Sequence, residues 1–127
     1  MKQIISTNKA PRAIGIYSQA VKVGNTVYFS GQISLDPETM EITRGDCKGH
    51  IHRAFSNMTA IAKAAGGNLS QIVKLTIYLT NMEHFVFVDE IMQKYYEEPY
   101  PARSVVTVKQ LPKNSLIAID AIMVLDE

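Results

Sequence analysis

The end of the chain carries the feature that most restricts its fold. Residues 116–125 read as a β-strand in which every side chain is apolar except the carboxylate of Asp120. A strand that is apolar on both faces is expected at the centre of a sheet, with both faces covered. The rest of the chain must therefore supply neighbouring strands and a covering layer.

Hydrophobic periodicity predicts those other elements. Apolar residues follow helical spacing in two stretches, and β-rich runs surround them. A Gly24-Asn25 turn joins two of these runs as a hairpin, and Gly66-Gly67 ends the first helix. The predicted strands cover residues 2–6, 21–34, 72–80, 103–109 and 116–125, and the predicted helices cover residues 50–65 and 84–98.

Two helices, each followed by a strand, predict a two-layer α+β fold in a single domain over residues 1–127, with a mixed sheet and both helices on one face. In the strand 72–80, the alternate residues from Val73 to Leu79 are predicted to form the dry face. The sheet face away from the helices then has no covering layer. If that face also carries apolar side chains, we expect an oligomer to bury it.

Composition excludes several classes of protein. Thirteen Lys and Arg against twelve Asp and Glu give a net charge of +1, so no basic field indicates binding to nucleic acid or acidic membranes. Cys47 is the single cysteine, which forbids an internal disulfide. No apolar run is long enough for a signal-peptide core or a membrane span. We therefore expect a soluble, cytoplasmic protein.

Motifs for metal or cofactor chemistry are missing from the sequence. It has no Gly-rich phosphate loop, no His-Glu-x-x-His and no Cys-x-x-Cys. His50 and His52 form a His-x-His pair, but side chains two apart on a helix point to different sides. We expect solvated histidines near the helix end and no metal site.

Arg103 is the residue whose position most suggests a ligand. It comes directly after the rigid Pro101-Ala102 step and is followed by five uncharged strand residues, 104–108. A guanidinium buried without a partner is costly, and its planar fork matches a carboxylate bidentately. From the residues alone, that carboxylate could belong to a ligand or to Asp120, and the internal ion pair is favoured.

A second candidate cluster lies nearer the N-terminus. Tyr17, Ser18 and Ser30 offer hydroxyl groups, and Gly15 and Gly31 permit close approach to the backbone. Taken alone, these are also ordinary turn residues.

Both clusters belong to a set of motifs whose order is specific even though each motif alone is weak. The motifs are Ala10-Pro11-x-Ala13-Ile14-Gly15-x-Tyr17-Ser18-Gln19-Ala20, Ser30-Gly31-Gln32-Ile33, Pro101-Ala102-Arg103-Ser104 and Leu111-Pro112-Lys113. In this order they resemble the RidA or YjgF family of reactive intermediate/imine deaminases, and the resemblance covers essentially the whole chain.

The resemblance implies a chorismate-mutase-like fold, assembled as a homotrimer with ligand clefts between neighbouring subunits. It implies hydrolysis of reactive imines such as 2-iminobutanoate and 2-iminopropanoate to 2-oxo acids and ammonia, with no cofactor. Matched by position, Arg103 would clamp the substrate carboxylate and Tyr17 would lie at the cleft rim. Ser30, Gly31 and Val105 would line the cleft.

The sequence departs from the family pattern at the residue that positions the attacking water. The family has a glutamate there, fifteen residues after the arginine, where this chain has Ala118. Asp120 matches the family's second acid and lies on the same strand face, but about 6–7 Å further along. No residue is therefore assigned as a certain catalytic group, and we expect weakened activity.

Three functions follow from these observations. The favoured one is an imine deaminase, a hydrolase acting on C–N bonds. The alternative is a non-catalytic trimeric module that binds a small 2-oxo or amino acid, and Ala118 favours it. Some relatives carry an endoribonuclease L-PSP or translation-inhibitor label, but this sequence shows no basic track for RNA. We expect no membrane partner.

Overall fold

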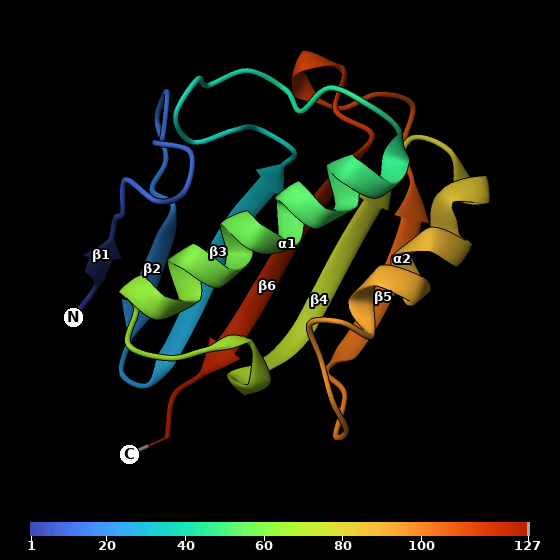
Figure 1. Cartoon of the computed structure of the whole chain (residues 1–127). Helices are drawn as coiled ribbons and strands as arrows, with labels where there is room; N and C mark the ends of the chain where they lie inside the picture. Colours follow the sequence, from blue (N-terminus) through green and yellow to red (C-terminus); the bar gives the residue numbers. More distant parts are fainter. Residues whose placement is uncertain (127) are drawn as a thin grey trace.

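The computed structural model describes residues 1–126 of the chain. Within them, six strands form one mixed sheet in the order β1-β2-β3-β6-β4-β5, and the two helices lie on the same face of it (Figure 1). Strands β4 and β5 pair in parallel and the other neighbours pair antiparallel. The strands are β1 (Gln3–Ile5), β2 (Ala20–Val23), β3 (Thr26–Ile33), β4 (Ile72–Leu79), β5 (Ala102–Thr107) and β6 (Ile117–Val124), the helices are α1 (Cys47–Ala64) and α2 (Phe85–Met92), and short 3-10 turns are η1 (Leu69–Gln71), η2 (Met82–His84) and η3 (Pro112–Asn114).

The position of β6 confirms the prediction made from its apolar sequence. It lies between β3 and β4 at the centre of the sheet. Ile117, Ile119 and Met123 on its helix side are at most 1% exposed. The described chain covers this face alone, so the two-layer prediction is confirmed and the second face of β6 stays open.

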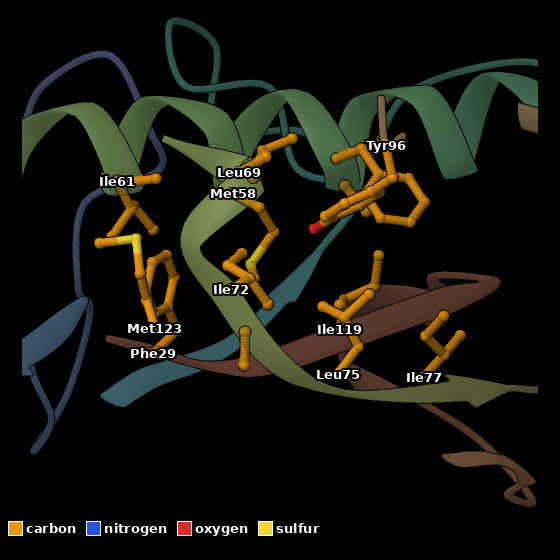
Figure 2. Close-up of a cluster of buried hydrophobic side chains, with 14 of the residues drawn as sticks. Phe29, Met58, Ile61, Leu69, Ile72, Leu75, Ile77, Tyr96, Ile119 and Met123 are labelled. Carbon is orange, nitrogen blue, oxygen red and sulfur yellow. The ribbon is translucent and has the colours of Figure 1, made fainter. Parts of the chain in front are cut away.

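The core lies between α1 and the sheet (Figure 2). Met58 and Ile61 of α1 face the strands, and Leu75, Ile77 and Ile119 lie across from them with no exposed surface. Complete burial of such a side chain contributes roughly 1.5–3 kcal/mol. This layer of contacts fixes α1 on the sheet.

Helix α1 begins three residues earlier than its apolar spacing predicts. Asp46 is its N-cap, and the Asp46 side chain accepts a hydrogen bond from the Gly49 N–H at 3.3 Å. This satisfies one of the donors that the first turn leaves free. The predicted glycine stop is confirmed, because Gly66 follows the helix with a φ of +93°, which glycine adopts without strain.

Helix α2 is shorter than predicted: it ends at Met92, whereas the prediction extended it to residue 98. Tight turns follow, in which the N–H of Tyr95 bonds to the Met92 carbonyl. They let two adjacent tyrosines reach the same core residue: the Tyr95 ring stacks on Phe55 with centroids 5.2 Å apart, and the Tyr96 ring meets Phe55 at 6.1 Å. A regular helix would point adjacent side chains in different directions.

The expected dry face of β4 is wrong at its first residue. Val73 is 47% exposed, whereas Ile72 is buried at 4%. The pairing with β6 shifts register between Ile72 and Lys74, which is a β-bulge. The extra residue reverses the alternation at that point, and Leu75 resumes the buried face.

The sheet face opposite the helices, called the open face here, carries exposed apolar side chains. Tyr28 of β3 is 50% exposed, Val124 of β6 is 42% exposed and Val106 of β5 is 40% exposed. The register places Tyr28 opposite Ile122 and Val106 opposite Tyr78, so all of them share this face. Among residues 1–126, neither helix is long and apolar enough to cross a membrane.

Candidate functional site

Arg103 lies on the edge strand β5 and points to the helix side of the sheet. Its register partner on β4 is the core residue Leu75. Its Nη1 donates to Oδ1 of Asp89 on α2 at 2.5 Å, and the guanidinium lies 5.2 Å from the centre of the Phe85 ring. The predicted internal pair with Asp120 is therefore wrong, because the acidic partner of Arg103 is Asp89.

Asp120 lies on the opposite face of the sheet from Arg103. In β4, Leu75 pairs with Arg103 whereas its neighbour Thr76 pairs with Asp120, and successive residues of a strand point to opposite faces. Asp120 accepts a hydrogen bond from the Tyr78 hydroxyl at 2.9 Å. That hydrogen bond, with some help from burial, raises the pKa of Tyr78. Asp120 thus belongs to the open face.

Arg103 lines an open hollow of about 350 Å³ together with Asp89, Met92 and Tyr100. The Arg103 side chain is 26% exposed. Its guanidinium hydrogen bonds within residues 1–126 all come from Nη1, to Asp89 and more weakly to the Met92 sulfur at 3.6 Å. A guanidinium has five N–H donors, so most of its donor capacity is available to a carboxylate in the hollow.

Tyr17, Ser30 and Gly31 come together at a second hollow of about 590 Å³. The Ser30 hydroxyl donates to the Ser18 carbonyl at 2.5 Å, and the Tyr17 hydroxyl accepts from the Ile14 N–H at 3.3 Å. These bonds fix the loop that carries Tyr17, whose side chain stays 51% exposed. A Cβ atom added to Gly31 would meet nothing within 4 Å, so the backbone there is open to a ligand.

The predicted site residues therefore lie in two separate groups, named here the arginine half-site and the tyrosine half-site after the site they are predicted to form. The arginine half-site contains Arg103. Val105 lies two residues further on the same side of β5, where it packs against the core and is not one of the residues that line the hollow around Arg103 or the hollow around Tyr17. The tyrosine half-site contains Tyr17, Ser30 and Gly31. Strands β6 and β4 separate β3 from β5, which puts the two strands about 14 Å apart. The two half-sites do not meet in one copy of the chain.

Ala118 lies on the open face of β6. Its register partners are Ile33 of β3 and Tyr78 of β4, and it is 7% exposed. Ile33 also lines the hollow of the tyrosine half-site. A longer side chain at position 118 would extend beside that hollow. Alanine offers no proton-accepting group there.

Sequence reasoning missed a buried polar network beside the tyrosine half-site. The Ser34 Oγ lies 2.6 Å from Nδ1 of His50 and 2.9 Å from Oγ of Ser115, and all three residues are at most 5% exposed. The Leu116 N–H also donates to Nδ1 of His50, so this nitrogen carries no proton. Burial lowers the pKa of His50.

The expectation that His50 is solvated is therefore wrong. The helical spacing already indicated that His50 is buried. Residues four apart lie on the same face of a helix, and Ala54 and Met58, four and eight residues after His50, are both buried. The second histidine, His52, lies with Nδ1 3.0 Å from the Tyr95 hydroxyl. Among residues 1–126, no three His, Cys, Asp or Glu side chains cluster so that they could hold a metal ion.

The fold and its half-sites define a small two-layer α+β protein of the chorismate-mutase-like type, with an arginine at one sheet edge and an open apolar sheet face. The sequence model described as Endoribonuclease L-PSP matches residues 7–125. The chain belongs to this family, which is the RidA/YjgF family that its motifs predict.

Relatives agree over nearly the full length. The chain is 44% identical over 125 residues to the 2-iminobutanoate/2-iminopropanoate deaminase of Dermatophagoides farinae, and 98% of each chain is covered. RidA from the Antarctic bacterium Psychrobacter sp. PAMC 21119 has a TM-score of 0.94 at 48% identity, covering 97% of this chain and 99% of that one. E. coli TdcF with bound serine has a TM-score of 0.93 at 38% identity, covering 98% and 99%.

Proposed function

We propose that this protein hydrolyses 2-imino acids to 2-oxo acids and ammonia, in clefts formed between the copies of a homotrimer. The names of relatives that are 42–44% identical over nearly their whole length support this reaction. The observation that carries the proposal is Arg103, a guanidinium with spare donors at an open hollow.

Every 2-imino acid carries a carboxylate next to the reacting carbon, and Arg103 is suited to hold it. Asp89 engages only Nη1 and is itself 51% exposed, so it steadies the guanidinium without occupying the whole fork. A bidentate contact between arginine and carboxylate fixes orientation as well as position. The serine bound to E. coli TdcF is also an α-carboxylate ligand.

A second copy of the chain would complete the site. The half-sites are too far apart in one copy for a small imino acid to contact both. The open face presents the apolar groups Tyr28, Val106 and Val124, which favours association because burying apolar surface is the main driving force for it. In the proposed trimer, the arginine half-site of one copy faces the tyrosine half-site of its neighbour.

The reaction needs little more than a positioned water. Water adds to the iminium carbon and forms the C–O bond, and the C–N bond then breaks with its electron pair going to nitrogen. Both water protons end on nitrogen, which leaves as ammonium while the carbon becomes the 2-oxo group. Tyr17 and the backbone at Ser30-Gly31 would orient the water. Because Ala118 is not a base, solvent must carry the proton, and positioning supplies the acceleration.

The test measures the lifetime of an imine generated in solution and trapped with semicarbazide. The protein should shorten that lifetime relative to buffer. Arg103→Lys keeps the charge but loses the fork, so hydrolysis should fall at least tenfold. Arg44→Lys, the same change at an exposed arginine in the loop before α1, is the matched control and should hydrolyse at the parent rate. An Arg103→Lys variant as fast as the parent would contradict the proposal.

Ala118 supports a second candidate, a module that binds a 2-oxo or amino acid without turning it over. The residue lies beside the tyrosine half-site and offers no acid or base. Calorimetric titration with 2-oxobutanoate, combined with the imine assay, separates the two candidates. Binding through Arg103 with an imine lifetime equal to that in buffer would select the module.

A further inference from the structure

We infer that the ligand of this protein carries a second carboxylate, at the end of its side chain, and that Arg12 and Lys113 bind it. The inference rests on the proposed function, because it names the class of 2-imino acid that the cleft selects. The substrates would be imines of acidic amino acids, and the products would be 2-oxo dicarboxylic acids. Arg103 would hold the first carboxylate, next to the reacting carbon.

The hollow of the tyrosine half-site is positively charged. Arg12 and Lys113 both line it, and none of its lining residues is an aspartate or glutamate. Neither cation forms an ion pair with another residue of the described chain 1–126, in which the ion pairs are Lys48–Glu90 and Arg103–Asp89. Two cations beside one hollow raise the local concentration of anions and favour a negatively charged group between them.

The backbone presents Lys113 to the hollow in an unusual conformation. Lys113 has a φ of +55°, in the left-handed region that residues other than glycine and asparagine rarely adopt, and Asn114 follows it with a φ of +59°. The next residue, Ser115, is tied into the buried network with Ser34 and His50. Such conformations persist where the surroundings enforce them, and they gather at ligand sites. Met40, which also lines this hollow, has a φ of +59° as well.

The buried side chain of Gln19 fixes the segment that carries Arg12, as the buried network at Ser115 does for Lys113. Gln19 is 2% exposed, and its Nε2 donates to the carbonyls of Thr7 at 3.0 Å and Pro11 at 2.7 Å. The carbonyl of Pro11 belongs to the peptide bond of Arg12. Both cations therefore stand on backbone held by buried polar groups, even though their own side chains are exposed. A rigid support lowers the entropy lost when a ligand binds.

The size of the hollow also fits a longer ligand than 2-iminobutanoate. Its volume of about 590 Å³ lies in the range of pockets that hold drug-sized molecules, and Tyr17, Ser30 and Gly31 occupy only part of its wall. A carboxylate fits the guanidinium fork of Arg12, and Lys113 adds a point charge. A four-carbon monocarboxylic imino acid has no group that these cations could bind.

The test compares the affinity of the whole protein for two product acids by calorimetry. The probes are 2-oxobutanoate, with one carboxylate, and 2-oxoglutarate, with two. The parent should bind 2-oxoglutarate at least tenfold more tightly. In the double variant Arg12→Gln/Lys113→Asn the ratio of the two dissociation constants should fall close to one. Asparagine is chosen because it tolerates the left-handed conformation. If the double variant does not fold, Arg12→Gln alone decides, because its side chain is exposed.

Lys109→Gln is the matched control. Lys109 is an exposed cation on the same connection between β5 and β6, but it lines a different hollow, so its removal should leave the ratio unchanged. A parent that binds both acids equally well, or a double variant that keeps the preference, would overturn this inference and leave the proposed function standing. A parent that binds neither acid would also overturn this inference, and the imine-lifetime assay would then decide the proposed function by itself.

Discussion

Replacing Ala118 by glutamate should increase the rate of imine hydrolysis. The new side chain would leave the open face of β6 beside Ile33, which lines the tyrosine half-site. A carboxylate there could accept the proton that solvent must otherwise carry. General acid or base groups typically contribute about 10²–10⁴-fold, so a gain of about tenfold or more is expected even with imperfect placement.

Two costs accompany this change: desolvation of a carboxylate at a position that is only 7% exposed, and repulsion from Asp120. The two carboxylates would lie about 6–7 Å apart along β6. Repulsion at that distance is about 0.6 kcal/mol in water and about 2.5 kcal/mol at an effective dielectric constant near 20. This repulsion alone would raise the pKa of the new glutamate from about 4.3 to between about 4.8 and 6.2. Repulsion would therefore leave the group ionised at neutral pH and able to act as a base.

The assay compares Ala118→Glu with Ala118→Gln, which has the same size but cannot accept a proton. At equal concentrations of folded protein, the glutamate variant should clear the imine faster than both the glutamine variant and the parent. Its rate should also rise with pH as the new carboxyl group ionises. Equal rates for the two variants, with no such inflection, would refute the reasoning.

Three further outcomes follow from the packing. The parent should sediment as a trimer and Tyr28→Asp as a monomer, because the aspartate places a charge on the apolar open face; a parent that sediments as a monomer would contradict this. Tyr96→Phe should leave stability unchanged or raise it by about 1 kcal/mol in urea unfolding at fixed protein concentration, since the Tyr96 hydroxyl is buried without a partner among residues 1–126; a loss of stability would show that the hydroxyl is bonded. Stability should fall as pH is lowered through about 6.5, because burial lowers the pKa of His50 and the unfolded chain takes up the proton first. His50→Asn keeps an acceptor for the Leu116 N–H and should flatten the dependence of stability on pH. If the slope of stability against pH is unchanged in this variant, groups other than His50 cause the dependence.

Local sequence patterns predicted the parts of the fold that depend on local physics. A strand apolar on both sides has no stable place at an edge, so the central position of β6 followed from residues 116–125. The glycines after α1 ended that helix as expected. The bulge at Val73 could not be predicted, because it depends on pairing with β6, which is distant in sequence. Nor could the turns after α2, in which Tyr95 packs on Phe55 of the other helix.

In the candidate site, too, the features that depend on local sequence could be predicted and those that depend on distant partners could not. The residue types of Arg103, Tyr17 and Ser30 were visible in the sequence, but their partners were not. Arg103 pairs with Leu75 of β4 and points to the helices. Asp120 pairs with the next residue of β4, Thr76, and therefore points away from them. Register is set by contacts between strands, so a single sequence could not show that Asp89 is the acid beside Arg103.

The separation of the half-sites makes catalysis and assembly inseparable in the proposed mechanism. Three steps across the sheet separate β3 from β5, a span of about 14 Å, which is more than a small imino acid can bridge. Only a second copy can bring Tyr17 to the ligand held by Arg103. The Tyr28→Asp variant should therefore lose hydrolysis together with the trimer, although its own substitution touches neither half-site hollow. A monomeric variant that still shortened the imine lifetime would show that one half-site is enough.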